Sequence, residues 1–242
     1  DVYKRQTGYI VYRDDGDGAT PSIVAYDGTG ATATTATISD LTGGTAYSYI
    51  VASLSGSGVG DVSSVATQST SPATPLDLSS TLQTSTSISL SWSASVVQSG
   101  GAAVTGYKVY RDDGAGGAVD VVAYDSRANS GDHVSTSCVV SGLTGGLTYT
   151  YQVSALSLAG ESDRSAVMTS PTSPFQVSGV SSTLQTTDSI TLSWSAPSAS
   201  TGNEASGYMV YHNDGVGGSE MSSVGSVSYT HLRAHETVLD LV

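Results

Sequence analysis

Two histidines near the end of the chain have the spacing of a metal site. His231 and His235 lie four residues apart, with Glu236 adjacent. On a helix this spacing would place both imidazoles on one face, where they could bind zinc. A zinc site also needs a third ligand and groups that orient the ligands. The pair alone supplies neither, so we predict no metal site.

The two ends of the chain differ in composition from everything between them. Residues 1–6 (DVYKRQ) and 227–242 (VSYTHLRAHETVLDLV) break abruptly from a sequence rich in Ser, Thr and Gly. Both strings resemble translated sequencing adapter, and we expect them to be artefacts and leave them out of the fold prediction. The histidine pair falls inside the second string.

An acidic string, DDGDG at residues 14–18, offers carboxylates that could bind calcium. Calcium loops place their oxygen ligands at alternating positions before a glycine. The series from Asp15 runs through Asp17 to Ala19 and fails there, and the related strings DDGAGG and NDGVGG lack the middle acid. We therefore interpret all three strings as turns, which favour Asp, Asn and Gly.

The candidates for nucleophilic catalysis are few. Cys138 is the single cysteine, and it alternates with Val140 on a predicted strand. Ala36 occupies the corresponding place in a repeat described below, so we interpret Cys138 as a small buried side chain rather than a reactive thiol. His133 and His212 do not recur between repeats, and the chain has no G-x-S-x-G elbow. We predict no catalytic residue and no cofactor.

Composition excludes two kinds of partner. The 242 residues carry a formal charge of −13, and no cluster of Lys or Arg is present. A nucleic-acid-binding protein needs such a cluster to neutralise phosphates, so we expect no nucleic-acid partner. No apolar run approaches the about 18 residues of a membrane span, so we expect no membrane segment in this fragment. Abundant Ser, Thr, Val and Tyr are typical of half-buried strands.

The chain repeats itself with a period of about 100 residues. Two strings, LTGG followed by a Tyr-rich run and SSTLQT followed by LSWSA, each return after 102 residues. A third string occurs three times, as GYIVYRDDG at 8–16, GYKVYRDDG at 106–114 and GYMVYHNDG at 207–215. A unit of this length is too long for a solenoid repeat and has the size of a self-contained domain.

Within one unit the apolar residues alternate with a period of two, which predicts strands. Connections rich in Gly, Ser, Asp and Pro separate these strands. The residues expected on the inward faces are Ile88, Leu90, Trp92, Tyr107, Val109, Cys138, Val140, Tyr149, Tyr151, Val153 and Ala155.

The thrice-repeated string predicts a strand followed by a reversal. Asp113-Gly114 is a pair that accepts positive φ in a two-residue turn, so the chain can reverse into VDVVAYD at 119–125. Asp15-Gly16 and Asp214-Gly215 repeat the pair.

The order of these residues resembles a fibronectin type III module, a seven-strand β-sandwich. Trp92 would lie on the second strand and Tyr107 on the third, and Leu143 precedes Tyr149 by six residues. The resemblance implies that the hydroxyl of Tyr149 binds nearby backbone, as a tyrosine corner does. Many members have proline at the third position of LTGG, and its absence here implies a less rigid turn. The implied structural core is Trp92, Tyr107, Leu143, Tyr149, Trp194, Tyr208, Leu41 and Tyr47.

The resemblance implies an all-β chain of tandem immunoglobulin-like sandwiches, one complete and two truncated. Residues 7–70 would be the C-terminal part of one module, because no tryptophan strand precedes GYIVY. Residues 72–170 would be a complete module, and residues 173–225 the N-terminal part of a third. Short links rich in Pro, Ser and Thr would join them. We refer to these three stretches as the first, middle and last segments.

Two loops were considered as binding sites. Arg111-Asp112-Asp113 is similar to an Arg-Gly-Asp adhesion tripeptide but is not one, and we interpret it as a solvated turn. The loop before the last strand reads SLAGESD at 157–163 and offers no Trp, Tyr or Arg of the kind that dominates protein interfaces.

The resemblance implies a protein that is not an enzyme. We expect an extracellular or cell-surface array that acts as a spacer, an adhesive or an interaction scaffold, with an unidentified protein or glycan ligand as its partner. In the alternative, the modules are accessory parts of a secreted polysaccharide-active enzyme or of a receptor ectodomain. Fold alone does not separate these functions.

Overall fold

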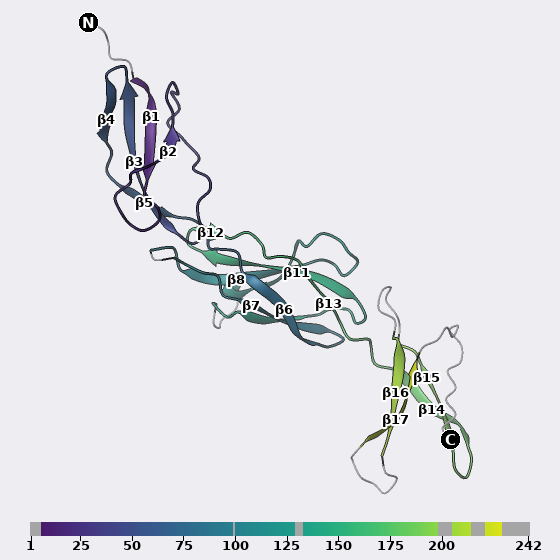
Figure 1. Ribbon diagram of the computed structural model, residues 1–242. Coiled ribbons are helices and arrows are strands. Elements are labelled where there is room, and N and C mark those ends of the chain that lie inside the picture. Colours follow the sequence, from purple (N-terminus) through teal and green to yellow (C-terminus); the bar gives the residue numbers. More distant parts are fainter. Residues whose placement is uncertain (1–5, 99, 129–132, 198–204, 214–220, 229–242) are drawn as a thin grey trace.

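The computed structural model describes residues 6–98, 100–128, 133–197, 205–213 and 221–228. In these residues the chain forms β-strands and one short 3₁₀ turn, which confirms the predicted all-β class. Figure 1 shows the strands in three groups that follow one another in a row. Asp214-Gly215, His231, His235 and Glu236 lie outside the described residues.

The middle segment forms two antiparallel sheets that pack face to face. One sheet has the order β10-β7-β6, and the other has the order β12-β11-β8-β9 with β13 also paired to β11. The 3₁₀ turn, Ser126–Ala128, follows β9. The strands are β6 (Leu76–Gln83), β7 (Ser87–Ser93), β8 (Val104–Arg111), β9 (Val121–Asp125), β10 (Ser137–Ser141), β11 (Thr148–Ser157), β12 (Gly160–Glu161) and β13 (Met168–Pro171).

The core of the middle segment lies between these sheets. Alternate residues of β7, β8 and β11 face one another and are almost completely buried, as the period of two predicts. The indole of Trp92 meets the ring of Tyr107 edge to face, with 5.4 Å between the ring centroids. This pair therefore joins the two sheets through the favoured geometry of aromatic contacts.

The first segment forms a single sheet. Its order is β2-β1-β3-β4, with β5 also paired to β3. Ala36, the expected buried counterpart of Cys138, is exposed, and residues 33–39 form no strand. In the middle segment Cys138 is aligned by pairing with Leu90 of β7, and the first segment has no such neighbour. The strands are β1 (Gln6–Arg13), β2 (Ile23–Asp27), β3 (Ala46–Ser55), β4 (Gly58–Val62) and β5 (Ala66–Ser69).

The last segment forms two hairpins. β14 (Ser178–Gln185) pairs with β15 (Ile190–Ser195), and β16 (Gly207–His212) pairs with β17 (Ser222–Ser228). Trp194 meets Tyr208 edge to face at 5.4 Å, as Trp92 meets Tyr107. Both side chains are only half-buried, whereas Trp92 and Tyr107 are buried.

The turn after β8 differs from the prediction. Asp113-Gly114 does not form a two-residue reversal, because residues 112–120 all lie between β8 and β9. Gly114 does have positive φ, 81°. The cause is Asp112, which is 1% exposed and whose Oδ1 accepts hydrogen bonds from the backbone N–H groups of Gly114 (3.1 Å) and Thr150 (3.0 Å). These bonds tie the chain to β11 before it reverses.

The tyrosine corner implied by the family resemblance is present. The hydroxyl of Tyr149 accepts a hydrogen bond from the backbone N–H of Thr144 at 2.9 Å. Tyr47 accepts the same bond from Thr42, also at 2.9 Å. Tyr47, Tyr149 and Leu143 are buried, and Leu41 is half-buried. The six-residue spacing from leucine to tyrosine therefore returns as the same local geometry in both segments.

Removal of the Tyr149 hydroxyl should destabilise the middle segment. Tyr149→Phe leaves the Thr144 N–H without its acceptor, at a cost of about 1–3 kcal/mol in the free energy of unfolding. Tyr151→Phe is a matched control, because Tyr151 is equally buried and its hydroxyl has no hydrogen-bond partner in the described structure. Urea unfolding of both variants tests this, and equal destabilisation would refute the corner's role.

We expect one cooperative unfolding transition in calorimetry. The cluster of buried apolar side chains described above belongs entirely to the middle segment. A two-sheet core of this kind supports the usual ~5–15 kcal/mol of stability, whereas a single sheet or a pair of hairpins leaves its apolar face open. Two or three transitions of comparable enthalpy would show that the outer segments fold independently.

Candidate functional site

The residues with catalytic or metal-binding potential are dispersed. Among the described residues, no three of His, Cys, Asp or Glu come together in a group that could hold a metal ion. His133 lies beside the 3₁₀ turn, with its Nδ1 2.7 Å from the carbonyl oxygen of Ser126. His212 ends β16, in the last segment. The structure therefore brings neither histidine to a nucleophile.

The carboxylates of the acidic turns bind backbone N–H groups. Asp14 repeats the role of Asp112: its Oδ1 accepts from Gly16 at 3.2 Å and from Ser48 at 3.0 Å. Asp113 accepts from Ala115 at 2.8 Å and from Gly117 at 3.3 Å, and these bonds lower the pKa of its carboxyl group. Such bonds are the means by which Asp stabilises a turn.

The thiol of Cys138 is half-buried against the core of the middle segment. Burial raises its pKa to about 12. Because the thiolate is the nucleophilic form, Cys138 stays protonated and unreactive near neutral pH.

Two arginines lie over the corner tyrosines. Arg13 lies 5.4 Å from the ring centroid of Tyr47, and Arg111 lies at the same distance from that of Tyr149. Each also donates a hydrogen bond of 2.7 Å to the carbonyl oxygen of the next residue, an aspartate. Arg111 is thus held by intramolecular contacts over the corner tyrosine, and it is half-buried rather than fully solvated as the sequence predicts.

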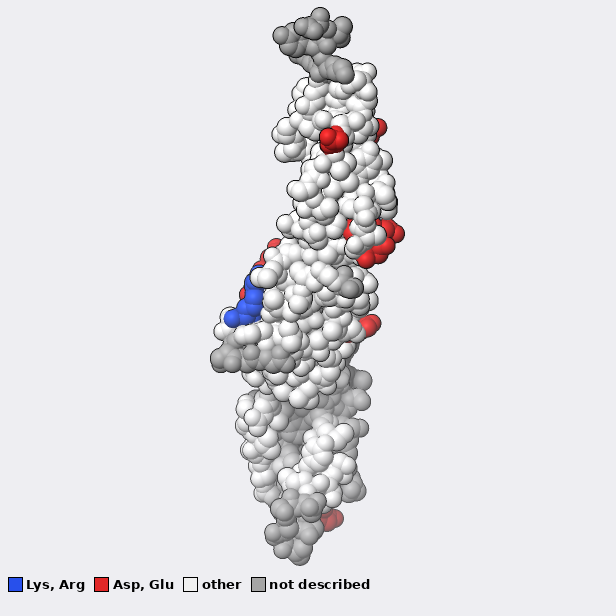
Figure 2. All heavy atoms as spheres, turned by 90° about the vertical axis from the view of Figure 1, so that its left-hand side faces the viewer, with Lys and Arg blue, Asp and Glu red and all other residues white. Residues whose placement is uncertain are grey.

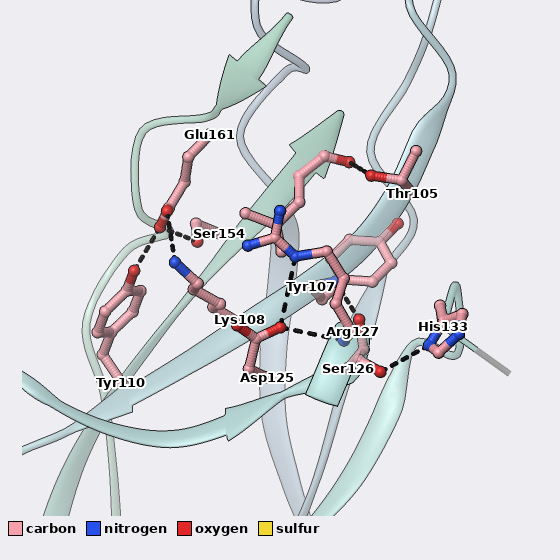
Figure 3. A network of polar contacts seen from close by, with 11 residues as sticks. Thr105, Tyr107, Lys108, Tyr110, Asp125, Ser126, Arg127, His133, Ser154 and Glu161 are labelled. Atoms are coloured by element: carbon pink, nitrogen blue, oxygen red, sulfur yellow. Dashed lines mark hydrogen bonds and ion pairs between the residues drawn. The ribbon is translucent and has the colours of Figure 1, made fainter. Parts of the chain in front are cut away.

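Lys108 and Arg164 belong to a polar cluster on the outer face of β8 and β11. Figure 3 shows four of its members: Lys108, Tyr110, Ser154 and Glu161. Glu161, in β12, accepts hydrogen bonds from Ser154 Oγ at 2.6 Å, from Lys108 Nζ at 3.1 Å and from the hydroxyl of Tyr110. Arg164 covers the ring of Tyr110, 3.7 Å from its centroid. We call these five residues the Glu161 cluster.

The Glu161 cluster shifts the pKa values of its members. Burial would raise the pKa of Glu161, but the hydrogen bonds from Ser154, Tyr110 and Lys108 outweigh it and lower the pKa. The bond to Glu161 raises the pKa of Lys108. Both charged forms are therefore favoured across the physiological range, as expected of an ion pair.

A second set of contacts holds the 3₁₀ turn against β8 (Figure 3). The Ser126 hydroxyl accepts a bond of 2.8 Å from the Tyr107 N–H, and Asp125 accepts one of 3.0 Å from the Arg127 N–H. A Cβ on Gly106 would lie 2.4 Å from the Ser126 Oγ, so only glycine permits this close approach. These contacts fix the position of the 3₁₀ turn relative to β8.

The Glu161 cluster was missed in the sequence. The string SLAGESD contains Glu161, but its aromatic and arginine partners, Tyr110 and Arg164, lie outside the string. Lys108 and Tyr110 point outward because they alternate with the inward Tyr107 and Val109. The sequence signal for this cluster was the presence of a cation, Lys108, and a tyrosine, Tyr110, two residues apart on the same outward face of a predicted strand.

The described basic side chains are thus all engaged in intramolecular contacts: Arg13, Lys108, Arg111, Arg127 and Arg164. In Figure 2 blue basic side chains are seen in one place on the visible face, whereas the acidic side chains are scattered and most of the face is uncharged. A helix suited to crossing a membrane is not found among the described residues.

Acid should remove the contribution of Glu161 to stability. Its pKa is lower in the folded state, so the contribution is complete above the unfolded value of about 4.3 and is lost as pH falls through the folded value. Glu161→Gln should lower the free energy of unfolding by up to about 1 kcal/mol at pH 6, and the difference from the parent should shrink at pH 3. Asp163→Asn, on the same loop, is the control and should have little effect at either pH. A Glu161→Gln effect that does not change with pH would contradict this.

Curated relatives match long stretches of the chain. Exoglucanase B of Cellulomonas fimi is 32% identical over 247 aligned residues, which cover 93% of this chain and 20% of the relative. Chitinase A1 of Niallia circulans is 33% identical over 169 residues, covering 66% of this chain and 22% of the relative. The chain therefore spans about a fifth of the length of these two relatives.

Solved structures and one family model also match parts of this chain. The solved structures include one titled "Myokine structure", 19% identical with a TM-score of 0.34, which covers 43% of this chain and 99% of that one. The chicken CNTN1 FN1–FN3 domains are 21% identical with a TM-score of 0.35, and the match covers 69% of this chain and 56% of that one. The pattern of the fibronectin type III domain matches residues 73–171. These residues, with their two packed sheets, belong to the fibronectin type III family.

Proposed function

We propose that this chain is a non-catalytic spacer within a longer extracellular enzyme that acts on a polysaccharide. The observation that carries the proposal is the extent of the match to exoglucanase B, which runs over 93% of this chain but only 20% of that protein. The match to a second relative, named a chitinase, likewise covers only 22% of that protein. In both relatives the greater part of the protein lies outside the region that this chain resembles.

The chemistry of the described residues supports a spacer. The acidic turns are engaged with backbone N–H groups, Cys138 is protonated, and the basic side chains are held by intramolecular contacts. Catalysis of polysaccharide cleavage needs a pair of carboxyl groups flanking the bond to be broken. The catalytic groups of the proposed enzyme would therefore belong to another domain.

An extracellular location follows from the proposed substrate. A polymer such as chitin is too large to enter a cell, so an enzyme that acts on it works outside. Within this enzyme we propose that residues 7–70 and 173–225 are parts of modules and that residues 72–170 are a whole one. Modules in a row (Figure 1) would set the distance between the catalytic domain and its neighbours.

A scaffold or adhesive array is the second candidate. The repeat of about 100 residues and the net charge of −13 favour it, because an acidic surface keeps repeated modules soluble and apart. Its partner would be a protein or a glycan bound weakly at several modules. A receptor ectodomain would use the modules in the same way.

Sequencing outward from this coding region separates the two candidates. For an enzyme, we expect a neighbouring domain with paired acidic residues. Further copies of the repeat alone would support the scaffold and overturn the proposal.

A sedimentation assay tests the spacer directly. The purified chain, mixed with insoluble chitin or an insoluble glucan, should remain in the supernatant and release no reducing sugar, because the described residues offer neither a catalytic centre nor a row of exposed aromatic rings. Retention on either polymer would show that the chain binds the substrate and is more than a spacer.

A further inference from the structure

We propose that the turn at residues 41–44 is a docking surface for the 96–101 loop of the middle segment, and that this contact fixes the angle between the two segments. The turn is the LTGG string, which lies just before β3 and its corner tyrosine, Tyr47. The 96–101 loop lies between β7 and β8. The partner of this surface is therefore the next repeat of the same chain.

Backbone hydrogen bonds connect the two segments at Gly44. Its carbonyl oxygen accepts a bond of 3.0 Å from the N–H of Gln98, and its own N–H donates a bond of 2.6 Å to the carbonyl oxygen of Ser71. The Ser71 hydroxyl then donates at 3.4 Å to the carbonyl oxygen of Ala159, in the turn between β11 and β12. Gly44 thus joins the linker on one side and the middle segment on the other.

The segments approach so closely that side chains are excluded from the contact. A Cβ on Gly101 would lie 2.0 Å from the Gly44 carbonyl oxygen. A Cβ on Gly44 would lie 2.8 Å from the carbonyl oxygen of Val96, and Gly44 also has positive φ, 69°. Real Cβ atoms do not come this near to backbone oxygen, so the contact requires glycine on both sides.

The same geometry explains the glycine that stands where many family members have proline. A Cβ on Gly43 would lie 3.1 Å from the Cα of Ala73, in the linker, so a proline ring would displace the linker. In the next copy, a Cβ on Gly145 would lie 3.0 Å from the carbonyl oxygen of Ser85, in the same segment, and 3.1 Å from the ring of Phe175, at the start of the last segment. Gly146 donates to Ser173 at 3.1 Å, as Gly44 does to Ser71. The glycine pair therefore serves linker packing in both copies.

This contact changes how a linker of a few residues behaves. Neighbouring domains joined by a short linker move relative to one another by default, unless an interface restrains them. Two hydrogen bonds at Gly44 supply such a restraint: the N–H of Gln98 donates to its carbonyl oxygen, and its own N–H donates to the carbonyl oxygen of Ser71. The inference holds for an enzyme spacer and for a scaffold alike, so its failure would leave both candidate functions standing.

Paired spin labels test the docking. Cysteines replace Ser64 in the first segment and Val122 in the middle segment, both exposed, in a Cys138→Ser background. Pulsed dipolar spectroscopy then measures the distance distribution between the labels. We expect one narrow peak for the parent chain and loss of this peak in Gly101→Ala, because its methyl group would displace the Gly44 carbonyl.

Two further variants make the result decisive. Gly56→Ala is the matched control, because its methyl group meets no atom within 4 Å, and it should keep the narrow peak. Gln98→Pro removes the N–H that binds Gly44 and also fixes φ at this position, and it should lose the peak even if Gly101→Ala fails to fold. A broad distribution in the parent, or a narrow unchanged peak in both folded junction variants, would overturn the proposal.

Discussion

The constraint on which the structure depends is that a β-sheet with one apolar face must bury that face against another layer. In the middle segment the second layer is present, and the contact between Trp92 and Tyr107 lies where the layers meet. The same contact recurs between Trp194 and Tyr208, but the strands around it are fewer and both rings stay half-buried. The first segment has the sheet without the covering layer, and its Ala36 is exposed as a result.

Around this core the thrice-repeated string acts as a unit. In the middle segment its arginine covers the corner tyrosine and donates to the carbonyl of the following aspartate, while that aspartate binds the strand next to it. The third copy has His212 and Asn213 in place of this pair. Arg13 and Asp14 make the same contacts in the first segment. The arginine and the aspartate of this string therefore make the same structural contacts in the first and middle segments.

Much of the fold could be predicted from the sequence because its signals are local or periodic. The inward faces of β7 and β11 follow from a period of two, and the corner of Tyr149 follows from the resemblance to a fibronectin type III module. Asp112 could not be predicted, because its partner Thr150 lies 38 residues away on another strand. The Glu161 cluster was missed for the same reason, since Lys108 and Glu161 are 53 residues apart. Long-range pairs of this kind become visible only once the strand order is known.

The two halves of the contact at Gly44 are the turn before β3 and the loop between β7 and β8, and the middle segment has its own copy of each, because its LTGG turn precedes β11. An interface of this type is heterologous and does not close on itself. A gene duplication that copies one whole repeat would carry both halves with it. Such a chain can lengthen by unequal recombination without the evolution of any new complementary surface.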